Sequence, residues 1–127
     1  MAQSTGLAVV DLATGEVKRV ANDTRENIAA IDGLYEYQGS LIGVQNVTNP
    51  GRVIVMTLSR DGGTVTGVKT LLSHHHASLD EPTTGAIARD GFYLLAATAV
   101  TRYNREGKVD NPDTVPMATV VRVPLPR

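Results

Sequence analysis

Imidazole and carboxylate side chains with the spacing of metal ligands occur together in residues 73–82, the segment SHHHASLDEP. His74 and His76 are two positions apart, so in an extended segment their side chains would point to the same side. Together with Asp80 or Glu81, two imidazoles could bind a transition metal such as Zn²⁺. The alternative is that the histidines are solvated in a polar loop and that the two acids belong to an exposed turn before Pro82.

Asp32 and Asn46 are a second pair of candidate ligands, on either side of an apolar stretch. Carboxylate and amide oxygens suit a hard cation such as Ca²⁺, which takes several oxygen ligands at about 2.5 Å. Each residue also has a purely structural interpretation, since Asp before Gly and Asn at a strand end often accept backbone N–H bonds in turns. The predicted metal ligands are Asp32, Asn46, His74 and His76, and the predicted substrate-binding residues are Asn49, Asp80, Glu81 and Tyr103.

The elements that must position these residues are short strands. Residues 31–72 contain four of them, at 33–37, 40–45, 52–58 and 64–72. Every break between them carries turn chemistry: Gln38-Gly39, the Asn49-Pro50-Gly51 sequence, and Ser59 to Gly63. Four antiparallel strands in about 40 residues is the size of one β-propeller blade.

The flanking segments continue the pattern. Strands are predicted at 6–12 and 16–20 before the central four, and at 83–89, 92–98 and 117–125 after them, with a long polar connection at 99–116. The expected fold is a single all-β domain over residues 1–127, a partial propeller with one full blade (31–72) and two incomplete ones (6–20 and 83–125). Open blades expose sheet faces and edges, so we expect a homo-oligomer to close the fold. An open β-meander or a sandwich is the alternative fold.

In such a propeller the loops after the second strands and the connections between blades share one face. That face would bring together segments 22–32, 46–51, 73–82 and 99–116, and with them all of the candidate residues named above.

The central segment resembles the regucalcin/gluconolactonase-type family of six-bladed propellers, in its C-terminal half only. The resemblance is carried by Asp32-Gly33-Leu34, Gly39-Ser40-Leu41-Ile42-Gly43-Val44, Asn46, Gly51-Arg52-Val53, Thr83-Thr84-Gly85 and Phe92-Tyr93-Leu94. Members of that family are typically lactone hydrolases with a divalent cation at the mouth of the central channel. The resemblance implies that Asp32 is a cation ligand and the general base. The family's other protein ligands, a Glu and an Asn, would lie upstream of this sequence.

The composition of the chain indicates which classes of binding partner to expect. The net charge is −1, no apolar run approaches a membrane span, and there is no cysteine for disulfide or thiolate chemistry. We therefore expect no nucleic-acid or membrane partner. The start of the chain lacks the pattern of a signal peptide, so a cytoplasmic location is the default expectation and secretion stays open.

Three functional hypotheses remain. The chain could be part of a cation-dependent lactone hydrolase, with Ca²⁺ or Zn²⁺ and a lactone or sugar acid as ligands. It could instead be a non-catalytic propeller module for binding or assembly. Finally, it could be a truncated or engineered propeller piece that self-assembles.

Overall fold

The computed structural model describes residues 1–46, 51–73 and 75–126, and this part of the chain is built of β-strands with two short 3₁₀ turns and no α-helix. The strands are β1 (Ala2–Gln3), β2 (Gly6–Val10), β3 (Val17–Arg19), β4 (Ala21–Asn22), β5 (Ile31–Tyr37), β6 (Ser40–Gln45), β7 (Arg52–Leu58), β8 (Thr64–Leu72), β9 (Gly85–Ala88), β10 (Gly91–Ala97) and β11 (Thr119–Val123). The 3₁₀ turns are η1 (Val100–Arg102) and η2 (Pro112–Thr114). Within the described ranges no helix is long and apolar enough to cross a membrane.

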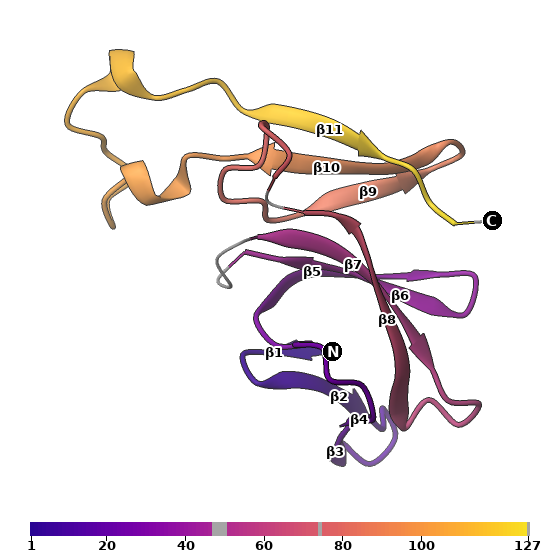
Figure 1. The fold of residues 1–127 in the computed structure, drawn as a ribbon. Coiled ribbons are helices and arrows are strands. Elements are labelled where there is room, and N and C mark those ends of the chain that lie inside the picture. Colours follow the sequence, from indigo (N-terminus) through magenta and orange to yellow (C-terminus); the bar gives the residue numbers. More distant parts are fainter. Residues whose placement is uncertain (47–50, 74, 127) are drawn as a thin grey trace.

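The strands form three sheets that lie one above another in an open stack (Figure 1). The central sheet has the order β4-β8-β7-β6-β5, the N-terminal sheet β1-β2-β3 and the C-terminal sheet β11-β10-β9. The predicted antiparallel meanders of two, four and three strands are all present. Two short strands were not predicted: β1, which pairs with β2, and β4, which pairs in parallel with β8 at the edge of the central sheet. The all-β prediction is therefore confirmed, while the central sheet is mixed rather than purely antiparallel.

Turn chemistry fixes the register of the central sheet. Gln38 and Gly39 both have positive φ, 50° and 77°, as a tight two-residue hairpin between β5 and β6 requires. The Glu36 carboxylate accepts the Gly39 N–H at 2.8 Å and holds this turn. The predicted bounds of β6, β7 and β8 agree with the structure, whereas β2, β9 and β11 are shorter than predicted.

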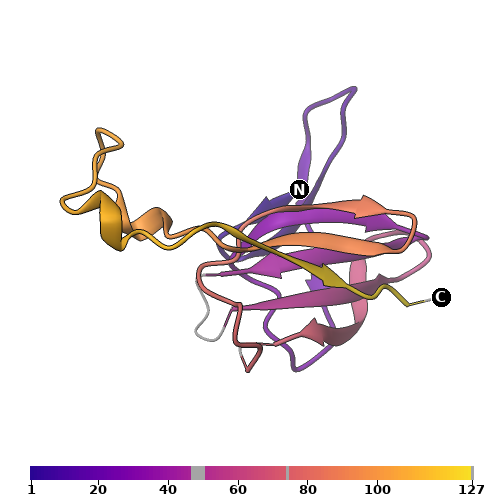
Figure 2. The same cartoon turned by 90° about the horizontal axis from the view of Figure 1, so that it is seen from above.

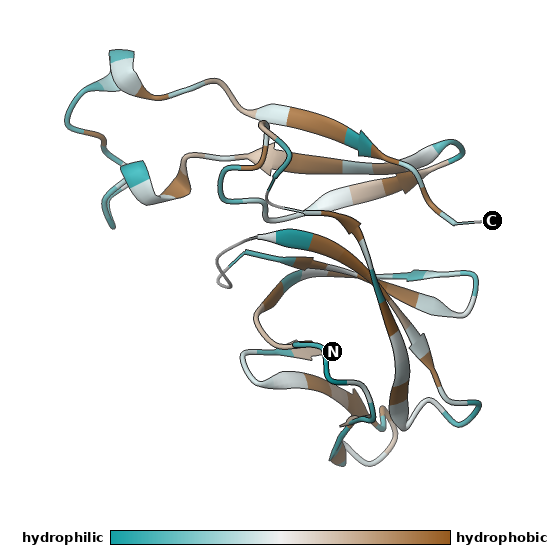
Figure 3. Ribbon diagram, viewed as in Figure 1, coloured by the Kyte–Doolittle hydropathy of each residue, from teal (hydrophilic) through white to brown (hydrophobic). Residues whose placement is uncertain are grey.

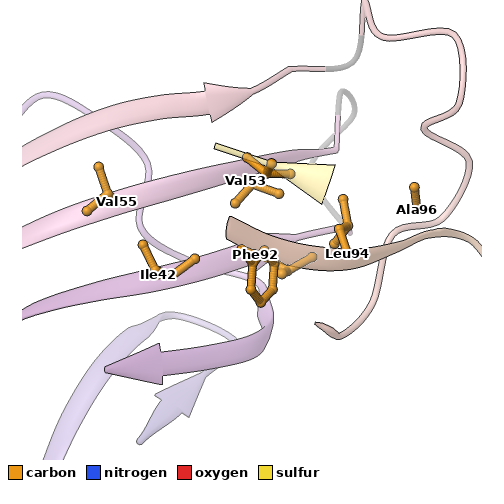
Figure 4. Packing of buried hydrophobic residues seen from close by; sticks show 8 residues of the cluster. Ile42, Val53, Val55, Phe92, Leu94 and Ala96 are labelled. Carbon is orange, nitrogen blue, oxygen red and sulfur yellow. The ribbon is translucent and has the colours of Figure 1, made fainter. Parts of the chain in front are cut away.

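Alternation along β6 and β7 divides the core into two layers. Ile42, Val44, Val53 and Val55 face the C-terminal sheet, where Phe92 and its neighbours complete one buried cluster (Figure 4). Ile54, Met56 and Val65 face the other way and pack with Leu7, Val20, Ile28 and Ile31 under the N-terminal sheet. The central sheet is thus covered on both faces, which explains why its middle strands read as continuous apolar runs (Figure 3).

The two ends of the stack differ. One end, here called the turn end, holds the hairpin turns at 38–39 and 89–90. The opposite end, the loop end, holds the connections 23–30, 73–84 and 98–118. The 98–118 connection, here called the arm, projects well beyond the sheets at the loop end (Figures 1 and 2). Its turn at 104–108 is held by its own bonds, with the Asn104 side chain accepting the Glu106 and Lys108 N–H groups at 2.9 Å.

Candidate functional site

Asp32 and Asn46 meet at the loop end of the central sheet. Ile31 pairs with Gln45 and Gly33 with Val44, so Asp32 is the extra residue of a bulge near the start of β5. A bulge re-aims the side chain of its extra residue, and here the Asp32 carboxylate accepts a hydrogen bond from the Asn46 side-chain amide. The other polar atom of that amide, Oδ1, is buried and has no hydrogen-bond partner among the residues that the structure describes. The pair therefore offers two carboxylate oxygens and one unpartnered amide oxygen.

A buried polar network lies next to this pair. Gln45 is fully buried, and its Nε2 donates to the carbonyl oxygens of Asn27 and Ala29 at 3.1 and 2.6 Å. Its Oε1 accepts a hydrogen bond of 2.7 Å from Arg52 Nε. Arg52 also pairs with Glu26 at 3.0 Å. The network ties the 23–30 connection to β6 and β7, and so fixes the strand ends that carry Asp32 and Asn46.

The acids of residues 73–82 have structural roles that join their loop to β10 and to the arm. Asp80 forms a parallel bridge with Ala97 through its backbone. Glu81 has a positive φ of 56°, and its carboxylate accepts the Thr101 N–H of η1 at 3.2 Å. Its carbonyl oxygen accepts the Thr98 hydroxyl at 2.9 Å. Glu81 therefore anchors the base of the arm.

No hydrogen bond or ion pair joins the remaining predicted residues, His76 and Tyr103, to the Asp32–Asn46 pair within the described ranges. His76 Nδ1 accepts the Ser78 N–H at 3.3 Å within its own loop, and Tyr103 follows η1 on the arm. His74 and Asn49 lie outside the described residues. In the part of the chain that the structure describes, no three His, Asp or Glu side chains come together as a metal-binding group. The structure thus brings Asp32 and Asn46 together, and the metal-ligand and substrate-binding assignments stay predictions.

A hard cation needs more ligands than the Asp32–Asn46 pair supplies. Such ions take six to eight oxygens, and two side chains from the described ranges give at most three. The pair does not amount to a complete cation site by itself.

Two structural joints were missed by sequence reasoning. The first is the Arg52–Gln45–Glu26 network described above. The second is Tyr35, whose hydroxyl accepts the Gly85 N–H at 2.9 Å and is hydrogen-bonded to the Thr84 hydroxyl at 2.6 Å. The Tyr35 ring also packs against Phe92, with centroids 5.0 Å apart and planes tilted by 54°. A tyrosine in a mostly aliphatic chain is the one signal that could have indicated this joint between sheets.

Clear pKa shifts belong to groups in hairpin turns or bonded to them. The pKa of Asp61 is lowered, first by the hydrogen bond from the Ser59 hydroxyl and then by the Gly63 N–H. The Thr14 and Ala13 N–H groups similarly lower the pKa of Asp11. A hydrogen bond to Asp90 raises the pKa of Tyr93. These shifts report turn stabilisation rather than catalytic chemistry.

Comparison with known proteins gives no relative. No protein-family model matches the sequence, no curated protein matches it, and no solved structure matches the fold.

Proposed function

We propose that this chain is a propeller-type stack of sheets that functions by assembly, with further copies of the chain stacking head to tail on its two outer sheets. The observation that carries the proposal is the placement of exposed apolar side chains. Within the described ranges, the large hydrophobic residues that are exposed lie in the N-terminal sheet and its hairpin or in the C-terminal sheet and the arm: Met1, Val9, Leu12, Val17, Ile87, Val100, Tyr103, Met117 and Val120.

The outer face of the C-terminal sheet is the first contact surface. Val121 and Val123 point inward to the core, so Val120 and Arg122 point outward. Val120 lies opposite Leu95 across the β10–β11 pair and is 62% exposed. An apolar pair in the middle of a sheet face suits stacking against another sheet.

The β2–β3 hairpin is the second contact surface. Leu7 points into the core, so Val10 lies on the outer face, directly opposite Val17. Leu12, at the turn, is 96% exposed, and the hairpin projects beyond the other strands (Figure 2). An outer sheet already packs against each face of the central sheet, so a neighbouring copy that packs on an outer sheet would continue the same stacking. A head-to-tail contact of this kind gives either a closed ring or an open array.

Light scattering coupled to size exclusion at micromolar concentration tests the proposal. The unmodified chain should be larger than a monomer. Val17→Lys and Val120→Lys should each shift it toward the monomer, because each buries a charge in one of the two contact surfaces. Thr66→Lys, at an exposed position of β8, is the matched control and should leave the size unchanged.

A mixture of the two variants tests the head-to-tail geometry. Each variant keeps the contact surface that the other has lost, so an equimolar mixture should give dimers and nothing larger. A monomeric unmodified chain would overturn assembly altogether. If both single variants remain oligomeric, the assembly does not use these two contact surfaces.

Cation-dependent lactone hydrolysis is a second candidate, favoured by the contact between Asp32 and Asn46 and by the unpartnered Asn46 Oδ1. A neighbouring copy would have to supply further ligands. Calorimetric titration with Ca²⁺ and Zn²⁺ should show binding that Asp32→Ala abolishes, and hydrolysis of a sugar lactone should then depend on the bound cation. Absence of binding by the assembled protein would exclude this candidate.

A further inference from the structure

Two adjoining hollows lie at the turn end, and residues 124–126 contribute to the lining of both. The first has a volume of about 450 Å³, and its lining includes Ser40, Thr57, Lys69 and Pro126. The second has a volume of about 500 Å³, and its lining includes Arg89, Asp90, Arg122 and Leu125. Tyr37 lines both hollows. The two hollows, which share this residue, are together called the turn-end groove.

Positive charge exceeds negative charge in this groove. Lys69, Arg89 and Arg122 are its cationic residues and Asp90 is its carboxylate. Asp90 is already engaged, because it lies 3.8 Å from the Arg122 guanidinium and both of its oxygens accept the Tyr93 hydroxyl at 3.1 Å. Arg122 in turn donates a hydrogen bond of 2.7 Å to the Asp90 carbonyl oxygen. The charge and one hydrogen bond of Arg122 are thus already taken up by Asp90.

The other two cations have no such partner. Among the described residues, the side chains of Arg89 and Lys69 make no hydrogen bond or ion pair, and the Tyr37 hydroxyl makes no hydrogen bond. Lys69 lines the first hollow, Arg89 lines the second, and Tyr37 lines both. A guanidinium, an ammonium and a phenol hydroxyl that face one groove are donors without acceptors. Their shared complement is an oxyanion, which the guanidinium binds through two parallel hydrogen bonds.

We propose that the turn-end groove binds a small organic anion through its carboxylate or phosphate group, with Arg89 as the main anchor and Lys69 and Tyr37 as secondary donors. Ser40 and Thr57 line the same groove and supply hydroxyl groups for the polar part of such a ligand. The site lies at the opposite end of the sheets from Asp32 and Asn46, so it is independent of cation chemistry at the loop end. It shares Arg122 with the outer face of the C-terminal sheet, while its anchors Arg89, Lys69 and Tyr37 belong to neither apolar contact surface.

Calorimetric titration of the full chain with inorganic phosphate and, separately, with citrate tests the proposal and distinguishes the two anion classes. Binding of at least one probe is expected, with an affinity that falls as NaCl is added. Arg89→Gln should weaken that binding about tenfold, as expected for loss of a charge-assisted hydrogen bond, and Lys69→Gln by a smaller factor. Tyr37→Phe tests the hydroxyl without changing charge. Circular dichroism checks that each variant keeps its strand content.

Arg105→Gln is the matched control, because it removes the same charge from the arm at the other end of the molecule. It should leave binding unchanged. The proposal is overturned if neither probe binds at millimolar concentration. It is equally overturned if Arg105→Gln weakens binding as much as Arg89→Gln does, since the interaction would then reflect overall charge alone.

Discussion

Arg52 donates a hydrogen bond of 2.7 Å from Nε to Oε1 of Gln45, and this bond satisfies the one acceptor of a fully buried side chain. The same guanidinium reaches the Asn27 carbonyl oxygen at 3.0 Å and the Thr70 hydroxyl at 3.2 Å. A single cation therefore joins β6, β7, β8 and the connection that leads into β5. This joint holds the loop end of the central sheet, where Asp32 and Asn46 lie.

Arg52→Ala should lower the free energy of unfolding by about 2 kcal/mol, because it leaves Gln45 Oε1 buried without a donor. Urea denaturation measures the change. Glu26→Gln is the control: the Glu26 carboxylate is half exposed, so loss of its ion pair with Arg52 should cost less than about 1 kcal/mol. Equal losses in the two variants would show that the ion pair, and not the buried amide, carries the stability.

Tyr35→Phe should destabilise the contact between the central and C-terminal sheets by about 1 to 2 kcal/mol. The variant keeps the ring against Phe92 but removes the acceptor of the Gly85 N–H and the partner of the Thr84 hydroxyl. Amide hydrogen exchange at Gly85 should accelerate together with the loss of stability. Tyr103→Phe, on the arm, should change neither quantity. Unchanged exchange at Gly85 in Tyr35→Phe would show that the hydroxyl does not hold β9.

Local patterns predicted the central strands well, because each boundary is set by residues next to it. Gln38-Gly39 takes the two positive φ values of a hairpin, and the Asp61 carboxylate closes the β7–β8 turn by accepting the Gly63 N–H. By contrast, β4 is two residues long and pairs in parallel with β8, more than 40 positions away in the sequence. Such a strand has no periodicity of its own and exists only because the tertiary structure brings its partner alongside.

The candidate site was predictable only in outline. The expected gathering of loops at one end does bring Asp32 to Asn46, since strand direction alone determines which loops share an end. The burial of Gln45 was not predictable, because β6 is covered on both faces and alternation cannot distinguish its sides. The role of Glu81 was also not predictable from the sequence. Its carboxylate accepts the Thr101 N–H, and that contact exists only because the arm passes close to the 73–84 connection.

Gly85→Ala should destabilise the fold by about 1 to 3 kcal/mol through overpacking. A Cβ at this position would lie 2.5 Å from Phe92 Cζ and closer still to the Tyr93 carbonyl oxygen. Gly67→Ala is the matched control in β8, where the added Cβ would make an ordinary contact with Thr57 at 3.6 Å. The control should be neutral or stabilising by up to about 1 kcal/mol, because alanine restricts the unfolded chain. Equal effects in urea denaturation would contradict the close packing of β9 on β10.

Asp61→Asn should reduce thermal stability at neutral pH and progressively less as the pH is lowered. The Ser59 hydroxyl and the Gly63 N–H hold the pKa of this carboxyl below its unfolded value. A group with a lowered folded-state pKa stabilises the protein above its unfolded pKa of about 4, and that contribution disappears as the pH falls through the folded value. Asparagine keeps an acceptor oxygen in the turn, so the two proteins should converge once Asp61 is protonated. Unfolding temperatures from pH 7 to pH 2 measure the difference, with Asp110→Asn on the arm as a control for the change in net charge. A difference that stays constant over this range would show that the ionised carboxylate has no special role in the β7–β8 turn.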